Sequence, residues 1–215
     1  MPTTDPSNPP GATLRSTSGL CADGAALHSA QARQALGEVL QALDEAQRSS
    51  GPGRPASLCQ AHTDLARALS GLQAHSLAQS HLAQALHWAQ VMSATDTCAD
   101  LHCALAEVAT NVADLADALG AARADVRQTR NRSRHHALEA ARLAGHTTDP
   151  HWEVKVLLRA SDVLDRCGSH GDAVQLQYRA MALIGLHNTA AQANTVPAGL
   201  HTADPFQITA PSQLM

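Results

Sequence analysis

Two helical patterns follow one another in residues 156–184, VLLRASDVLDRCGSHGDAVQLQYRAMALI, and a turn at Cys167-Gly168-Ser169-His170-Gly171 separates them. Apolar residues recur at helical spacing on both sides of this turn, and glycine readily interrupts a helix. Two short amphipathic helices joined in this way form a hairpin, which buries its apolar faces fully only against further helices. The stretch therefore predicts one unit of a stack of helix hairpins.

The rest of the chain contains further helical patterns, each bounded by residues that break helices. The clearest is a run of large apolar residues from Leu101 to Leu119 in steps of four and three. Asp149 and Pro150 are typical of a helix cap and a first helical residue. We expect about seven helices, one single helix and then three hairpins, over residues 25–48, 55–71, 76–92, 96–119, 125–144, 150–166 and 172–186.

The composition favours an all-α fold, because only 2% of the 215 residues are aromatic and β-branched residues are sparse. Residues 1–24 are rich in proline and small polar residues, a composition that is typical of disorder. We expect a disordered segment over residues 1–24, a helical repeat domain over residues 25–186, and an extended or disordered tail over residues 187–215.

Net charge and apolar content indicate which binding partners and which cellular compartment to expect. A net charge of −4 gives no general attraction to nucleic acid or to an anionic membrane. No segment approaches the roughly 18 apolar residues that cross a bilayer, and the first residues lack an export signal. Five cysteines at irregular spacings do not suggest a disulfide framework. We expect a cytoplasmic protein with reduced thiols and no membrane partner.

Small residues at fixed positions give the last hairpin a resemblance to a known repeat. Leu164, Gly168, Ala173 and Ala180 match the large residue, the turn glycine and the two alanines of the tetratricopeptide repeat, a helix–turn–helix unit of about 34 residues. The first hairpin fits the same frame with Leu65, Ala66, Leu69, Ala78, Leu82 and Ala85. The resemblance implies antiparallel hairpins stacked as a short right-handed solenoid, since alanines let helix backbones approach closely.

Several positions depart from that repeat. His62 and Leu157 replace an aromatic residue of the first helix, and Gln73 replaces the turn glycine of the first hairpin. Matching Ala85 to Ala137 makes the central unit long and places Arg130 where the family has an alanine. Such long units resemble the helical repeat domains of some bacterial transcriptional and signalling regulators, over about residues 55–186.

The resemblance implies a function by position. In this family the first helices line a concave groove that receives a peptide or protein segment. The corresponding residues are Gln60, Thr63, Arg67, Lys155, Leu158, Asp162 and Arg166. We expect a non-catalytic interaction module that binds a peptide or partner protein, while an ordinary solvated helix face is the alternative for these polar residues. Self-association into a homo-oligomer is a further expectation, because the helix over residues 25–48 has no hairpin partner.

An arginine stripe supports a second function. Arg123, Arg127, Arg130 and Arg134 fall on one face of a predicted helix, where forked guanidinium groups could grip phosphates or an acidic partner. The alternative function is therefore a regulatory domain that binds nucleic acid or another anion. A solvated face opposite Val126 and Leu138 is the simpler explanation of the stripe, and the lack of interleaved aromatic residues argues against nucleic acid.

Metal binding and catalysis receive less support. Cys59 with His62 and Cys98 with His102 have helical spacings that would suit zinc if the two helices were neighbours. Scattered cysteines are more often small buried apolar residues. The chain also lacks a phosphate-binding glycine loop, a nucleophile elbow and paired carboxylates in a recognisable context. We therefore expect no metal, no cofactor and no enzyme.

Overall fold

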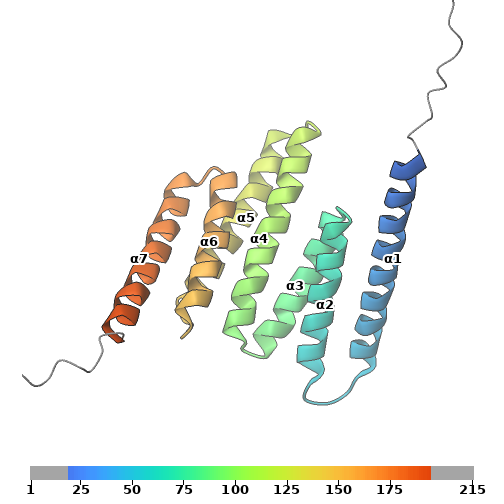
Figure 1. Ribbon diagram of the computed structural model, residues 1–215. Coiled ribbons are helices and arrows are strands. Elements are labelled where there is room, and N and C mark those ends of the chain that lie inside the picture. Colours follow the sequence, from blue (N-terminus) through green and yellow to red (C-terminus); the bar gives the residue numbers. More distant parts are fainter. Residues whose placement is uncertain (1–18, 195–215) are drawn as a thin grey trace, which may run out of the picture. The chain divides into compact units, whose positions relative to one another are not determined.

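The computed structural model describes the backbone of residues 19–194 and the side chains of residues 33–186. Within residues 19–194 the chain forms seven α-helices and no strand (Figure 1). These are α1 (Gly19–Arg48), α2 (Arg54–Gly71), α3 (His75–Val91), α4 (Thr95–Ala118), α5 (Arg123–Ala144), α6 (Pro150–Arg166) and α7 (His170–Asn194). The prediction of an all-α fold with about seven helices is confirmed.

The helix boundaries follow the helix-breaking residues. Helices α2 to α6 begin and end within two residues of the predicted positions. Helix α1 begins at Gly19, inside the segment expected to be disordered, and α7 continues to Asn194, inside the expected tail. The predictions for residues 1–18 and 195–215 lie outside the described residues.

The chain divides into two compact units, residues 1–94 and residues 95–215. The expected repeat domain, residues 25–186, includes parts of both. In the first unit α2 and α3 form a hairpin, and α1 packs against α2. Its buried residues are mainly leucine and alanine, and Ala78 and Ala85 on α3 are fully buried where the two helices of the hairpin pack. Small side chains at these positions allow close approach of the two backbones.

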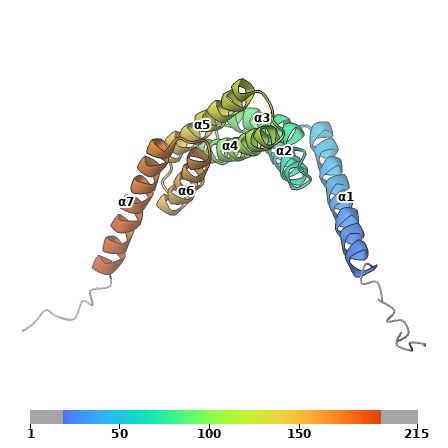
Figure 2. The ribbon, with the colours of Figure 1, turned by 90° about the horizontal axis from the view of Figure 1, so that it is seen from above.

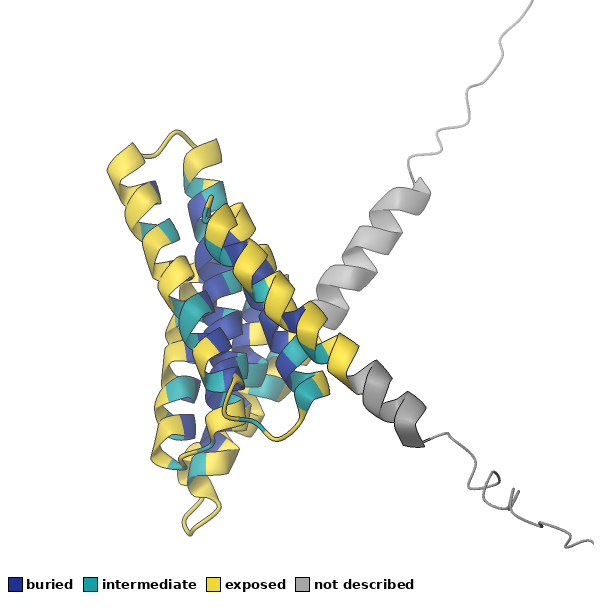
Figure 3. Cartoon of the chain, turned by 90° about the vertical axis from the view of Figure 1, so that its left-hand side faces the viewer, coloured by how far each residue is buried: buried dark blue, intermediate teal, exposed yellow. Residues whose placement is uncertain are grey.

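The second unit contains two hairpins, α4–α5 and α6–α7. Helix α6 packs against α4, α5 and α7, and Figures 1 and 2 both show α6 and α7 side by side. Its core combines two fully buried leucines of α6, Leu157 and Leu164, with Ala160 of the same helix and with alanines of α4, α5 and α7, namely Ala106, Ala137, Ala141, Ala173 and Ala180. Figure 3 shows the buried residues on the faces that the helices turn toward one another. Leucines thus fill the spaces that the alanines leave.

Caps and turns match the sequence signals. The Asp149 carboxylate accepts hydrogen bonds from the backbone N–H groups of His151 and Trp152, so its predicted role as a helix cap is confirmed. Gly168 adopts a φ of 80° in the turn of the last hairpin, a conformation that strains residues with a side chain. Gln73 adopts a φ of 60° in the first hairpin, which shows that it occupies the turn position of the missing glycine.

The first helices of the three hairpins bury residues at the same five positions. These are Leu58, His62, Leu65, Ala66 and Leu69 in α2; Cys98, His102, Leu105, Ala106 and Ala109 in α4; and Glu153, Leu157, Ala160, Ser161 and Leu164 in α6. Each set advances in the same steps and therefore lies on one helix face. The three hairpins are helical repeats.

The second helices show the same regularity and correct the predicted match in the centre. Buried residues fall at Ala78, Leu82, Ala85 and Ala89 in α3 and at Ser133, Ala137, Ala140 and Ala144 in α5. Ala85 therefore corresponds to Ala140, and the expected alanine position belongs to Ser133 instead of Arg130. Ser133 is fully buried, and its hydroxyl donates to the Ala106 carbonyl oxygen at 2.7 Å. A small side chain occupies this crossing in all three hairpins.

Two helices leave large apolar residues exposed. The apolar stripe of α4 is buried from Leu101 to Val108, but Leu115 and Leu119 near its end are 50% and 77% exposed. On α7, Val174, Tyr178 and Met181 are exposed, while Arg179 turns toward Glu153 of α6. Helical spacing identifies a face but does not show how far a neighbouring helix covers it.

Candidate functional site

Two arginines of α6 bind side chains of α4, the first helix of the preceding hairpin. Arg159 donates from Nε to Glu107 Oε1 at 2.9 Å and from Nη1 to Asp100 Oδ1 at 3.2 Å. Arg166 Nη2 donates to Asn111 Oδ1 and to Asp114 Oδ2, both at 2.8 Å. We call this surface the α4–α6 face; it comprises Asp100, Glu107, Asn111, Asp114, Lys155, Leu158, Arg159, Asp162 and Arg166.

The predicted groove residues of α6 all lie on the α4–α6 face. Lys155, Leu158 and Asp162 are exposed, and the structure shows no hydrogen bond or ion pair of Lys155 or Asp162 with any described residue. Leu158 is 47% exposed although it is apolar. Arg166 differs, because its guanidinium is engaged by α4. The face thus presents one apolar side chain between an unpaired cation and an unpaired anion.

The predicted groove residues of α2 lie in the first unit and are satisfied within their own helix. Asp64 accepts hydrogen bonds from Gln60 Nε2 at 2.8 Å and from Arg67 Nη1 at 2.6 Å. The Thr63 hydroxyl donates to the Cys59 carbonyl oxygen at 2.8 Å. A partner that used these groups would first have to replace local bonds, so α2 presents a weaker site than α6.

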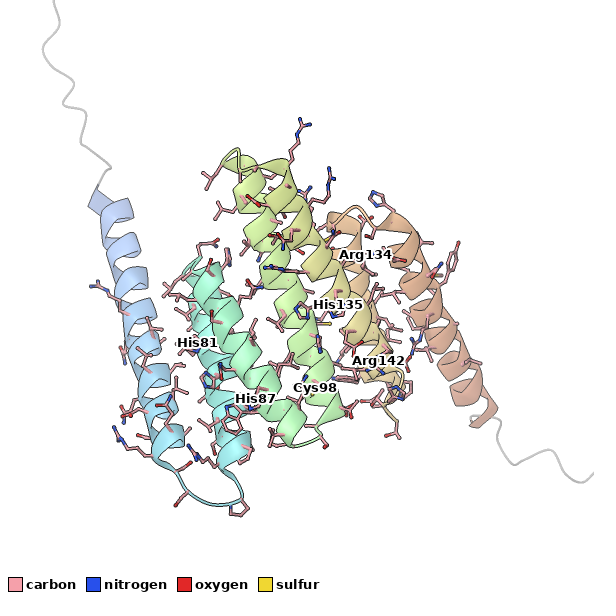
Figure 4. All side chains as sticks on the ribbon, turned by 180° about the vertical axis from the view of Figure 1, so that it is seen from behind. His81, His87, Cys98, Arg134, His135 and Arg142 are labelled. Carbon is pink, nitrogen blue, oxygen red and sulfur yellow. The ribbon has the colours of Figure 1, made fainter. Side chains whose placement is uncertain are left out.

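The predicted arginine stripe lies along α5, where Figure 4 labels Arg134, but it is not uniformly charged. Arg130 Nη2 lies 3.2 Å from Asp117 Oδ2 and 3.5 Å from Asp114 Oδ1. Arg134 is bound to Asp172 of α7 through Nε at 2.8 Å and Nη2 at 2.7 Å. Arg123 and Arg127 form no ion pair within residues 33–186. Half of the stripe is therefore neutralised by carboxylates of neighbouring helices.

A pocket of about 360 Å³ opens at the unpaired end of the stripe. Its walls come from the end of α4, the first turns of α5 and the residue that follows α6. The lining residues are Asp117, Arg123, Val126, Arg127, Arg130, Asn131 and Cys167. Three guanidinium groups thus face a single carboxylate around this pocket.

Two pairs of histidines lie between the helices of the first two hairpins. His62 of α2 and His81 of α3 approach with their Nδ1 atoms 3.1 Å apart, and His102 of α4 and His136 of α5 do so at 3.0 Å. The ring centroids are 5.3 Å and 5.2 Å apart, so the two pairs have similar spacing, although their rings are inclined by 26° and 42°. We call them the histidine pairs. They occupy corresponding positions of the two repeats.

Burial favours the neutral form of three of these histidines, His62, His102 and His136. It lowers the pKa of His62, with a further contribution from His81, and it lowers the pKa of His102. The pKa of His136 falls to about 4, because burial and then the neighbouring His102 and His135 disfavour its charged form. One imidazole of each pair can donate from Nδ1 while the other accepts.

The third hairpin has leucines at the positions of the histidine pairs. Leu157 takes the place of His62 and His102, and Leu176 takes that of His81 and His136. Leu157 is part of the core, and Leu176 packs against it. The spacing of His62 and His102 suggested metal ligands and gave no indication of their partners His81 and His136. The available signal was the equal position of His62 and His102 within their helices.

The four residues considered for zinc are divided between the two units. Cys59 and His62 belong to the first unit, and Cys98 and His102 belong to the second. Among the described residues, no three or more His, Cys, Asp or Glu side chains are grouped so that they could hold a metal ion. Burial raises the pKa of Cys98 and raises that of Cys103 to about 12. These two thiols therefore stay protonated and are poor ligands or nucleophiles at neutral pH.

Comparisons with known proteins do not define a family. No family model matches the chain, and a search of curated proteins gave no match. Among solved structures, the crystal structure of BtubC (BKLC) from P. vanneervenii is similar at 15% sequence identity, with a TM-score of 0.34. That similarity covers 88% of this chain and 82% of the other. Among the residues that the structure describes, no helix combines the length and apolarity needed to cross a membrane.

Proposed function

We propose that this chain is a non-catalytic interaction module of the tetratricopeptide-like type, and that its α4–α6 face binds a peptide or partner protein. The supporting observation is the exposed Leu158 between Lys155 and Asp162, which have no partner among the described residues. An apolar side chain can anchor a partner by burial, while unpaired charges of opposite sign can orient it.

The surroundings of Leu158 favour a preformed surface. Arg159 and Arg166 connect α6 to α4 on this face, so two first helices are held in a fixed register. The exposed ion pairs contribute little stability individually, on the order of 0–1 kcal/mol each. Their contribution here is to orient the side chains, since a surface that is already ordered loses less entropy when a partner binds.

The tetratricopeptide-like part of the proposal is supported by the recurring positions of small residues. Ala78, Ser133 and Ala173 share one position of the second helices. Gln73, Gly120 and Gly168 share a positive φ in the turns of the three hairpins. A common turn and a common crossing residue are what stacked helix–turn–helix units require.

Site-specific photocrosslinking in native cells tests the proposal. A photoreactive residue at Leu158 is expected to give a discrete protein adduct, whereas one at Val174 on α7, with a similar exposure of 45%, is expected to give none. Lys155→Glu with Asp162→Lys should weaken the adduct, because it reverses both orienting charges. Equal adducts from Leu158 and Val174, or an adduct unaffected by charge reversal, would contradict the proposed face.

The remaining expectations are tested separately. Cytoplasmic localisation is tested by cell fractionation, and self-association is tested by sedimentation of the purified chain over a range of concentrations. The alternative of nucleic-acid binding predicts an affinity that falls steeply with salt, whereas binding through Leu158 should persist as salt rises.

A further inference from the structure

The pocket beside α5 has an excess of positive charge, and its unpaired arginines are not part of the α4–α6 face. Of its three guanidinium groups, only that of Arg130 is paired, with Asp117 and Asp114. Arg123 and Arg127 line the same pocket and have no ion-pair partner among residues 33–186. The charge of Asp117 is thus offset by Arg130, and two cations remain uncompensated.

Hydrogen-bond donors are also left over around this pocket. The Nε–H group of Arg130 is buried and has no hydrogen-bond partner in the described part of the chain. The pocket lies at the beginning of α5, where Ala122 provides no side-chain cap for the first backbone N–H groups. Buried donors without acceptors are rare in folded proteins, and helix N-termini favour anions. Asp125 in the first turn is the one carboxylate there, and it does not line the pocket.

We propose that this pocket binds a phosphate monoester group through Arg123, Arg127 and Arg130. A phosphate monoester carries nearly two negative charges and has three terminal oxygens, so it matches two unpaired forked guanidinium groups one helical turn apart. A carboxylate has one charge and two oxygens, which a single guanidinium satisfies. The volume of about 360 Å³ admits such a group with a small organic portion, for which Val126 and Cys167 provide less polar wall.

The interrupted stripe argues against nucleic acid as the ligand. A strand of nucleic acid presents phosphates in a row and would engage basic residues along the helix. Arg134, which continues the stripe, is already bound to Asp172. Within the stripe, the unpaired arginines are therefore confined to the pocket, which suits one isolated phosphate group.

The experiment measures the affinity of the full chain for phosphoserine by calorimetry, with inorganic phosphate and acetate as comparison ligands. Phosphoserine and phosphate are expected to bind and acetate is not. Arg123→Gln with Arg127→Gln should weaken phosphoserine binding by about tenfold or more, because each removes a charge-assisted hydrogen bond. Arg132→Gln is the matched control: Arg132 is exposed on the same helix and does not line the pocket, so its variant should bind normally.

Two further ligands distinguish the source of the phosphate group. A phosphoserine peptide that binds more tightly than free phosphoserine would identify a modified side chain of a protein as the ligand. Equal affinity for glycerol phosphate would identify a free small ester. Either result supports the pocket, whereas failure of phosphoserine and phosphate to bind, equal binding by the double variant, or a preference for an oligonucleotide over both would overturn it. Melting temperatures of the variants should match the parent chain, since Arg123 and Arg127 are exposed.

Discussion

The Nδ1 atoms of His102 and His136 lie 3.0 Å apart across the α4–α5 hairpin, so one imidazole must donate to the other. This hydrogen bond requires at least one neutral ring, because two charged imidazoles would present two donors and repel. The same relationship recurs between His62 and His81 in the α2–α3 hairpin. Both hairpins therefore contain a polar pair whose contribution depends on protonation.

Acidification is expected to destabilise the chain through these pairs. The pKa of His136 is about 4 in the fold against an ordinary value of 6.5, so the unfolded chain binds more protons in this range. The stabilisation is complete above pH 6.5 and is lost as the pH falls toward 4. Between pH 7.5 and pH 5 we expect the free energy of unfolding to fall by about 1–2 kcal/mol, after allowance for partial exposure. Urea unfolding at the two pH values measures it.

A variant that copies the leucines of the third hairpin is the control for this pH dependence. His102→Leu with His136→Leu reproduces Leu157 and Leu176 and removes both titrating groups. The variant should fold at pH 7.5, and its stability should change less between pH 7.5 and pH 5 than that of the parent chain. An undiminished pH dependence in this variant would assign the effect to other groups.

Overpacking the last helix crossing is expected to be costly. Ala173 is 1% exposed, and its Cβ lies where α7 meets the core of the second unit. Ala173→Leu should lower the free energy of unfolding by about 1–3 kcal/mol, since the added atoms have no space. Ala182→Leu on the exposed side of α7 should have little effect. Equal melting temperatures of the two variants would contradict the crossing.

The turn of the last hairpin is expected to require glycine. Gly168 has a φ of 80°, where a side chain costs about 1–2 kcal/mol even in open space. Gly168→Ala should therefore lower the melting temperature. Gly171 lies within α7 and has no positive φ, so Gly171→Ala should leave stability unchanged or raise it by about 0.5 kcal/mol. The reverse order of the two melting temperatures would rule out this account.

One ion pair is expected to matter more than the rest. Glu153 is buried, with a side chain 11% exposed, and Arg179 of α7 binds its carboxylate. Arg179→Met should cost about 1–3 kcal/mol, because it leaves a buried carboxylate without its cation. The Arg67 side chain is 73% exposed, so Arg67→Met should cost less than about 0.5 kcal/mol. Thermal unfolding compares the two variants, and similar losses would show that burial of Glu153 is unimportant.

Much of the fold could be predicted because helix boundaries are encoded locally. Asp149 with Pro150 fixes the start of α6, and Gly168 fixes its end, without any need for tertiary contacts. The alignment of the central repeat could not be predicted in this way. Helix α5 contains alanines at several positions that fit a helical frame. Ala137 and Ala140 are both fully buried, so the alignment follows only from the whole pattern of burial along the helix.

The candidate site was predicted only where one helix carries all of it. The α6 residues Lys155, Leu158 and Asp162 share a face by spacing, and the structure leaves that face exposed. The state of the arginine stripe depends on acidic residues of other helices, notably Asp172 of α7. Spacing within α5 could not reveal which arginines they neutralise, and it could not reveal that His136 approaches His102.

At the end of the α4–α5 hairpin where the two helices are joined, Leu115 and Leu119 remain 50% and 77% exposed. Segments of this kind open more readily than the core of a domain. The arginine-lined pocket draws its walls from these same ends. A bound phosphate group would therefore connect the end of α4 to the beginning of α5. Its affinity would be reduced by the free energy needed to order these helix ends.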